Sequence, residues 1–201
     1  MVVDGIYYGL AFGAAGGAAW WLVGLPYAVP LFLLGAFCLY FFRDPDREIP
    51  VGPVAVSPAD GKVVAVRQES PTLTRVSVFL NIFDVHVNRS PVAGTIKEVF
   101  YKKGRFHVAS LEVASAENEQ NLVVIDSDGT EVAFRQIAGL IARRVVFRKQ
   151  PGDRVETGER IGLIKFGSRV DVLLGPEWDV EVRPGMRVRA GSSVLAKRRL
   201  G

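Results

Sequence analysis

Thirty-eight consecutive residues, from Gly5 to Phe42, carry no charge, and this run constrains the fold more than any other feature of the sequence. As one helix it would be about 57 Å long, whereas the apolar core of a bilayer is about 30 Å thick. Gly24, Pro26 and Pro30 in "GLPYAVP" break such a helix near its middle. The run therefore predicts a transmembrane helical hairpin rather than one long helix.

We expect the two helices at about 6–23 and 27–42, each near the lower limit of length for a span. A single tilted or re-entrant anchor and a cleaved signal peptide are the alternatives. A signal peptide would have a basic start, whereas the only charge before the run is Asp4. Arg43 and Arg47 follow the run directly, so the positive-inside rule predicts a cytoplasmic location for the rest of the chain.

From residue 44 onward the pattern is typical of β-structure. Short apolar or alternating runs are separated by turns, as in "VAVSPADGKVVAV" and "NLVVIDSDGTEVAFRQIAG". Asp60-Gly61 and Asp128-Gly129 are typical of hairpin turns, and only 110–121, "SLEVASAENEQN", indicates a helical turn. We predict a membrane anchor at 1–43 and a mostly β domain at 44–201.

An internal repeat refines the fold of this β domain. "PGDRVETG" begins at Pro151 and "PGMRVRAG" begins at Pro184, 33 positions later. The shared pattern PGxxVxxG is typical of a turn, a short strand and a second turn. Two copies suggest paired β-hairpins folded around each other, as in barrel-sandwich hybrid domains such as the lipoyl carriers. That comparison concerns architecture alone, because fold does not imply function.

Charge and metal-ligand content exclude some classes of function. The net charge is only +4, and the cations are spread along the chain, so the concentrated basic face of a nucleic-acid binding protein is not expected. The sequence has one cysteine, Cys38, and two histidines, His86 and His107. A metal site built from thiolates and imidazoles is therefore not expected either.

Three short segments carry residues suited to catalysis. Asp60 lies in "SPADGKV", His86 lies in "FLNIFDVHVNRSPVAG", and Gly167-Ser168 interrupts the strand-like run "RIGLIKFGSRVDVLL". Each has an ordinary structural explanation when it is taken alone. Asp60 could only shape a turn, His86 could be a hydrogen-bonded core residue, and Gly167-Ser168 could be a β-bulge.

Taken together, the segments resemble the phosphatidylserine decarboxylase proenzymes, in the short class seen in archaea and some bacteria. The resemblance runs from about Phe41 to Leu174. It rests on several motifs in the family's order: "FFRDPDR", "SPADGKV", "FLNIFDVHVNRSPVAGTI", "ASAENEQN", "QIAGLIARR" and "GERIGLIKFGSRVDV". The apolar hairpin before them also matches short members of the family. Several long motifs in order are far more specific than any one of them.

The resemblance implies that the chain cleaves itself between Gly167 and Ser168. The Ser168 hydroxyl would attack the Gly167 carbonyl, and the amide would shift to an ester. Elimination would leave dehydroalanine, which hydrolyses to a pyruvoyl group and ammonia. A base must accept the hydroxyl proton, and the family pattern assigns Asp60 and His86 to the catalytic positions. The pyruvoyl ketone would then act as an electron sink for decarboxylation, with His86 suited to protonate the resulting carbanion.

The sequence departs from the family's longer members at Arg89. Those proteins have a second histidine three residues after the first, and that second histidine is the one assigned to cleavage. Arginine stays protonated and is a poor base. His86 is therefore expected to serve both steps, unless another base serves cleavage.

The predicted protein is a pyruvoyl-dependent decarboxylase in the cell membrane that converts phosphatidylserine, or its archaeal-type ether analogue, to phosphatidylethanolamine. Residues 44–201 would be its catalytic domain on the cytoplasmic side. Its partners would be the phospholipid substrate and the fragments 1–167 and 168–201, and a homodimer stays open. Arg43, Arg47, Lys102, Lys103 and Arg105 are candidates to meet lipid phosphate. The alternative functions are decarboxylation of a soluble amino acid and a membrane-anchored, non-catalytic carrier or adaptor.

Overall fold

The structure is a computed structural model that describes residues 2–109, 113–139, 145–164 and 168–199. It divides into two compact units, residues 1–46 and residues 47–201. The first unit is helical and the second is built mainly of strands.

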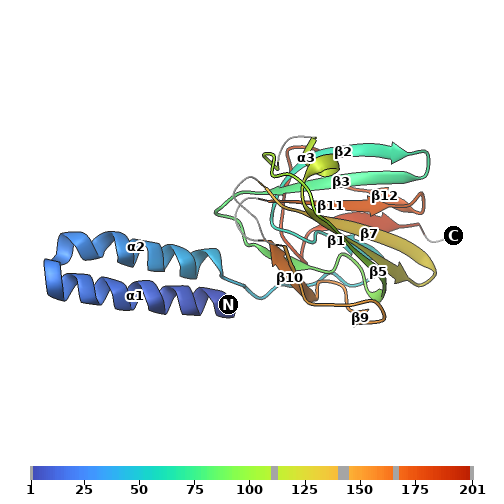
Figure 1. The fold of residues 1–201 in the computed structure, drawn as a ribbon. Helices are drawn as coiled ribbons and strands as arrows, with labels where there is room; N and C mark the ends of the chain where they lie inside the picture. The colour runs from blue at the N-terminus through green and yellow to red at the C-terminus, as the bar shows by residue number, and fades with distance from the viewer. Residues whose placement is uncertain (1, 110–112, 140–144, 165–167, 200–201) are drawn as a thin grey trace. The chain divides into compact units, whose positions relative to one another are not determined.

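Two helices, α1 (Val3–Val23) and α2 (Leu25–Phe41), form an antiparallel hairpin in the first unit (Figure 1, blue). The break between them is the single residue Gly24, whose φ of +100° favours glycine. Pro26 lies in the first turn of α2, where its missing N–H costs no intrahelical hydrogen bond. The predicted pair of helices is therefore present, with a shorter connection than "GLPYAVP" indicated.

Small residues let the two helices approach closely. Side chains of α2 and of the residue after it cover the glycine positions of α1: Phe42 covers Gly5, Leu39 covers Gly9 and Phe32 covers Gly16. A Cβ atom at any of these three glycines would collide with the covering side chain. Among the described helices, α1 is long and apolar enough to cross a membrane, and α2 is a shorter apolar helix of 17 residues.

The second unit confirms the mostly β prediction. Its one helix in the described part of the chain is α3 (Val113–Glu117), inside the segment predicted to have a helical turn. The strands are β1 (Val54–Val56), β2 (Gly61–Ser70), β3 (Leu73–Leu80), β4 (Val87–Arg89), β5 (Gly94–Lys102), β6 (Gln120–Ser127), β7 (Thr130–Ile137), β8 (Val145–Phe147), β9 (Arg154–Val155), β10 (Arg160–Ile164), β11 (Ser168–Leu174), β12 (Trp178–Val180), β13 (Arg187–Val188) and β14 (Val194–Arg198).

Eight of these strands form one curled sheet in the order β13-β2-β3-β11-β7-β6-β5-β9 (Figure 1). Two three-stranded sheets, β1-β14-β12 and β4-β10-β8, complete the unit. The core lies on one face of the large sheet, where Val78, Phe134 and Val172 are fully buried. Strand β11 lies in the middle of the sheet, antiparallel to both β3 and β7, and every residue of β11 is buried.

The two predicted hairpin turns have different outcomes. Asp128 and Gly129 connect the paired strands β6 and β7, both with positive φ, as predicted. Asp60-Gly61 does not form a hairpin, because β1 pairs with β14 while β2 pairs with β3 and β13. Gly61 is instead required by close packing, since a Cβ atom there would collide with the carbonyl oxygen of Phe79.

The internal repeat has a counterpart elsewhere in the chain. The PGxxVxxG copies contain β9 and β13, which lie at the two edges of the large sheet. β13 pairs with the start of β2, at Gly61, and β9 pairs in the same way with the start of β5, at Gly94. Segment 90–96 follows segment 57–63 by 33 positions, the same offset that separates the two PGxxVxxG copies. The large sheet therefore has two similar halves.

Backbone hydrogen bonds follow this pseudo-symmetry closely. Gly191 N donates to Ser57 O at 2.8 Å in the first half, and Gly158 N donates to Ser90 O at 2.8 Å in the second. The halves are also joined reciprocally: Val56 N donates to Pro91 O at 2.8 Å, and Arg89 N donates to Pro58 O at 2.9 Å. Asp60 follows Pro58 by two residues, and His86 precedes Arg89 by three. Both therefore lie close to the hydrogen bonds that join the two halves.

Candidate active site

Ser168 is the first residue of β11, in the centre of the large sheet. It pairs with Leu80 of β3, and its side chain lies on the same face as Val170 and Val172, toward the core. Its hydroxyl is fully buried and has no hydrogen-bond partner within the described parts of the chain. An unpaired buried hydroxyl costs about 1–3 kcal/mol, so this arrangement calls for a functional explanation. Gly167, the other half of the predicted cleavage point, lies outside the described residues.

His86 is held beside the end of β10, four residues before Ser168. Ile164 N donates to His86 O at 3.3 Å, and the neighbouring residues Leu163 and Val87 pair between β10 and β4. The imidazole is 1 % exposed, and its Nδ1 lies 2.9 Å from the carbonyl oxygen of Asp84. A carbonyl can only accept, so Nδ1 carries the proton in the neutral ring and the basic lone pair is on Nε2.

Asp60 lies at the same end of the sheet, one residue before β2. Arg47 Nη2 donates to both carboxylate oxygens, at 3.0 and 2.8 Å, and Ala190 N donates to Oδ1 at 2.8 Å. The side chains of the pair are only 10 % and 13 % exposed. The register of β2, β3 and β11 brings the start of β2 next to Leu80, the partner of Ser168. Asp60, His86 and Ser168 are thus brought to one end of the sheet from three distant parts of the chain.

Nδ1 of His86 is held by a backbone carbonyl, that of Asp84. Asp60 is bound by Arg47 and Ala190, while Asp84 O binds His86 Nδ1. A carbonyl fixes the ring and its tautomer as a carboxylate does, but it adds no negative charge beside the ring. The site therefore differs from a serine–histidine–carboxylate relay in how its histidine is held.

Arg89, the residue at which the sequence was expected to depart from longer family members, is buried in the structure. It is 5 % exposed, and its Nη1 donates to Gly158 O at 3.0 Å. Its Cδ also packs against Gly191, in the other copy of the repeat. The guanidinium stays charged, so this residue joins the two copies and does not act as a base.

A chain of buried amides lies beside these residues on the core face. Gln136 Nε2 donates to Asn88 Oδ1 at 2.8 Å, and Asn121 Nδ2 donates to Gln136 Oε1 at 3.3 Å. Gln136 pairs with Val170 across β7 and β11. These amides connect the segments of His86 and Ser168, and they were not among the residues predicted from the sequence. Their signal is an amide at a core-facing position of an otherwise apolar strand.

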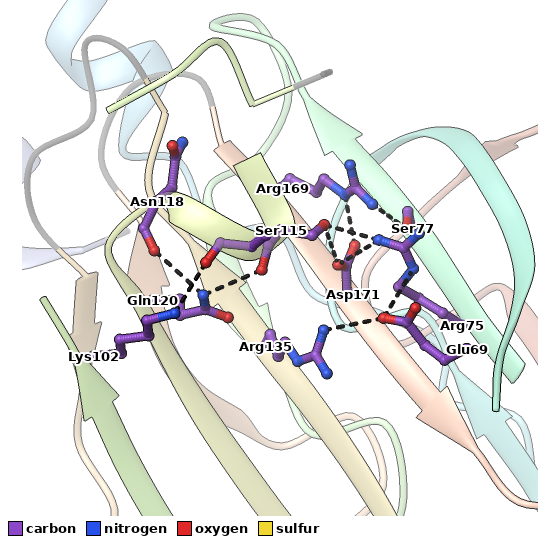
Figure 2. Close-up of polar contacts among 11 residues, drawn as sticks. Glu69, Arg75, Ser77, Lys102, Ser115, Asn118, Gln120, Arg135, Arg169 and Asp171 are labelled. Atoms are coloured by element: carbon purple, nitrogen blue, oxygen red, sulfur yellow. Dashed lines mark hydrogen bonds and ion pairs between the residues drawn. The ribbon is translucent and has the colours of Figure 1, made fainter. Parts of the chain in front are cut away.

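The opposite face of β11 carries a buried network of charges (Figure 2). Arg169 Nε donates to Asp171 Oδ1 at 2.6 Å, and Arg169 Nη2 donates to Ser77 Oγ at 2.7 Å. Asp171 Oδ2 also accepts from Ser115 Oγ of α3 at 2.8 Å, and Arg75 Nη1 lies 3.5 Å away. Arg169 and Asp171 are 1 % and 0 % exposed. The network fixes the strand that begins at Ser168 to β3 and α3.

Four of the five candidate cations for lipid phosphate have other contacts in the structure. Arg47 holds Asp60, Lys102 Nζ donates to Ala116 O at 3.0 Å, and Arg105 lies 3.6 Å from Glu117. In the first unit, Arg43 lies over the ring of Tyr40. His107, the other histidine of this chain, contacts a surface carboxylate, because its Nε2 lies 2.9 Å from Glu117.

Comparison with known proteins gives a consistent result. The family model described as phosphatidylserine decarboxylase matches residues 34–196. A phosphatidylserine decarboxylase proenzyme of Solibacter usitatus is 66% identical over 98% of this chain and 97% of its own. Proteins of the same name from Oleidesulfovibrio alaskensis and Desulfotalea psychrophila are 45% and 43% identical, over 86% and 83% of this chain and 82% of theirs in both cases.

Proposed function

Because the chain belongs to the phosphatidylserine decarboxylase family and is a decarboxylase of that phospholipid, we propose that it works through a pyruvoyl group made from its own Ser168. The group would form when the chain cleaves itself between Gly167 and Ser168. The relatives' description as proenzymes supports a processing step. When formed, a pyruvoyl ketone withdraws the electrons left behind as CO₂ departs.

The observation that carries this proposal is the Ser168 hydroxyl. It is buried and has no hydrogen-bond partner among the described residues, although it begins a strand that is otherwise tightly paired. A nucleophilic hydroxyl must be free to approach a carbonyl carbon and to lose its proton. A serine that only filled space in this strand could be replaced by alanine without leaving a buried polar group unpaired.

We assign proton transfer to His86. Asp60 lies at the same end of the sheet and is assigned to the site as its carboxylate. With Nδ1 bound to Asp84 O, the Nε2 atom of His86 is the one that can accept or return a proton. Arg89 cannot share this task, so the single imidazole is assigned both to cleavage and to protonation of the substrate carbon. Asp60, fixed by Arg47 and Ala190, supplies the negative charge of the site.

The hairpin of α1 and α2 is proposed as a membrane anchor, with residues 44–201 as the catalytic domain on the cytoplasmic side. The uncharged run and the apolar length of α1 support the anchor. Arg43 and Arg47 after the run support the cytoplasmic side. If the full-length chain stays in the supernatant after lysed cells are ultracentrifuged, the anchor is wrong. A chain shortened to begin at Arg43 should need no detergent.

The intact mass of the purified protein tests self-cleavage. We expect two fragments, residues 1–167 and 168–201, with the shorter one blocked at its N-terminus. Ser168→Ala should leave one uncut chain. The sequence contains a matched control, because Gly191-Ser192 is a second Gly-Ser step, and Ser192→Ala should cleave normally. An uncut parent chain after long incubation, or a free serine amine on the short fragment, would contradict the proposal.

His86→Ala tests the double role of the imidazole. General acid–base catalysis is worth about 10²- to 10⁴-fold, so both the appearance of the short fragment and CO₂ release per cleaved chain should slow by such factors. Normal cleavage with lost CO₂ release would restrict His86 to decarboxylation. Normal rates in both assays would remove His86 from the site.

A further inference from the structure

The turn from Asn81 to Asp84, after β3, exposes two apolar side chains. Ile82 is 36 % exposed and Phe83 is 60 % exposed, at positions where turns usually carry polar residues. Asp84 N donates to Asn81 O at 3.0 Å, Phe83 N donates to Asn81 Oδ1 at 2.8 Å, and Asn81 N donates to Asp84 Oδ2 at 2.9 Å. The exposed side chains thus belong to a closed, hydrogen-bonded turn.

Both ends of this turn are connected to the candidate active site. Leu80, the residue before the turn, is the β3 partner of Ser168. Asp84, the last residue of the turn, binds His86 Nδ1 through its carbonyl oxygen. Anything that contacts Ile82 and Phe83 therefore lies next to the groups assigned to the reaction.

Cations flank the apolar tip. Arg187, whose side chain is 69 % exposed, donates from Nη1 to Asp84 Oδ1 at 3.2 Å. Lys62 is exposed and is the cross-strand partner of Arg187 between β2 and β13. Exposed apolar side chains beside Lys and Arg are the combination that anionic membrane interfaces attract.

The length of chain before the catalytic unit fits a membrane partner. Arg47 is fixed to Asp60 at this end of the sheet, and only residues 42–46 separate it from the end of α2. The six Cα–Cα steps from Phe41 to Arg47 span at most about 22 Å. If α2 lies in the bilayer, this end of the sheet stays within reach of the lipid headgroups.

We propose that Ile82 and Phe83 insert into the interface of an anionic bilayer, with Lys62 and Arg187 at its headgroups. This inference rests on the proposed function, since it brings Ser168 and His86 to a lipid whose acyl chains stay in the membrane. The two apolar side chains would hold the site at headgroup depth. The anchor keeps the protein near the membrane, and the turn orients it.

Spin labels in the full-length protein test the insertion. In a Cys38→Ser background, Phe83→Cys and Thr72→Cys carry a nitroxide, and the protein is placed in vesicles containing phosphatidylserine. Thr72 is the control, because it lies in the exposed turn at the opposite end of β3. We expect the label at 83 to be accessible to oxygen and shielded from a water-soluble nickel chelate, and the label at 72 to show the reverse.

Equal nickel accessibility at both positions would overturn the inference. Shielding at 83 without vesicles that grows with protein concentration would also overturn it, in favour of a second copy of the chain.

An activity measurement separates this inference from the proposed function. Phe83→Asp should cleave itself normally but lose about tenfold or more in CO₂ release from vesicles relative to detergent-dispersed phosphatidylserine, since a buried Phe contributes strongly to interfacial binding. Thr72→Asp should change neither rate. Equal losses in vesicles and detergent would overturn the inference. If the unmodified protein releases no CO₂ from either form, the proposed function fails, while the label positions still decide the docking.

Discussion

The two halves of the large sheet share one backbone arrangement but differ at one chemically important position. In the first half, Ser57 Oγ donates to Ala59 O at 2.7 Å, and in the second, Ser90 Oγ donates to Val92 O at the same distance. The position of Asp60 in the first half is taken by Ala93 in the second. The carboxylate is therefore not needed to build the turn, because the same turn forms without it.

The partners of Asp60 are specific to the first half as well. Its cation, Arg47, comes from the segment that follows the hairpin, which has no counterpart in the second half. The second half has a surface ion pair instead, between Lys149 and Glu159. Comparison of the halves separates the residues that form the scaffold from the residue that could serve the reaction.

Replacing Asp60 should have the largest effect. Asp60→Ala makes the first half resemble the second, and it should slow the appearance of the short fragment by about 10²-fold or more if the carboxylate serves cleavage. Ala93→Asp adds the carboxylate to the second half and should leave the rate unchanged. Cleavage of Asp60→Ala at the parental rate would mean that the carboxylate only pairs with Arg47.

The two strand-opening glycines should respond alike. A Cβ atom at Gly61 would collide with Phe79 O, and one at Gly94 would collide with Asp126 O. Gly61→Ala and Gly94→Ala should each lower the free energy of unfolding by about 3 kcal/mol or more. Denaturant titrations are best made in a Ser168→Ala background, which keeps the chain in one piece. Gly129→Ala is the control, because it has positive φ but open space; a loss as large there would show that dihedral strain alone explains the effect.

The paired serines test the symmetry at smaller cost. Ser57→Ala and Ser90→Ala each remove a buried hydrogen bond from the hydroxyl to a carbonyl and should each cost about 1 kcal/mol in the same titration. Equal losses would support a purely structural role for both serines. A slower cleavage in Ser57→Ala alone, at equal stability, would add Ser57 to the residues that position Asp60.

The smallest effect is expected for the ion pair found only in the second half. Partial burial raises the pKa of the Glu159 carboxyl, but hydrogen bonds from Lys149 and from Glu156 N outweigh it, so the pKa lies below its ordinary value. A lowered carboxyl pKa adds stability at neutral pH, and this stability is lost as pH falls through the folded-state pKa. Lys149→Ala should lower the denaturation midpoint slightly at neutral pH. The difference from the parent should shrink below about pH 4, and a constant difference would rule out this charge as its cause.

The sequence predicted the features that depend on neighbouring residues. The uncharged run predicted the paired helices, and the PGxxVxxG copies predicted turn, strand and turn, with Gly152, Gly158, Gly185 and Gly191 all at positive φ. The second pair of copies was missed because "SPADGKV" and "SPVAGTI" share only Ser, Pro and Gly. Three matches in seven residues do not by themselves indicate a repeat. The equivalent backbone hydrogen bonds of the two segments do.

Features that depend on strand order could not be predicted. The alternation in "SRVDVLL" and "TRVSVFL" shows polar residues on one face of each strand. It does not show that β11 lies beside β3, so the contact between Arg169 and Ser77, 92 residues apart, stayed hidden. The same limit explains the Asp60-Gly61 error, because a turn signal does not say which strands pair on either side.

If the chain cleaves itself as proposed, the central position of β11 makes that step hard to reverse. The segment 168–201 supplies a middle strand of the large sheet through β11, its edge through β13, and two strands of a second sheet through β12 and β14. A cut before Ser168 would leave two interwoven pieces that are no longer covalently joined. A denatured precursor can refold within one molecule, whereas denatured mature enzyme must find its second piece by diffusion and loses the effective concentration that the bond supplied. The mature form would thus persist through slow unfolding rather than through reversible equilibrium.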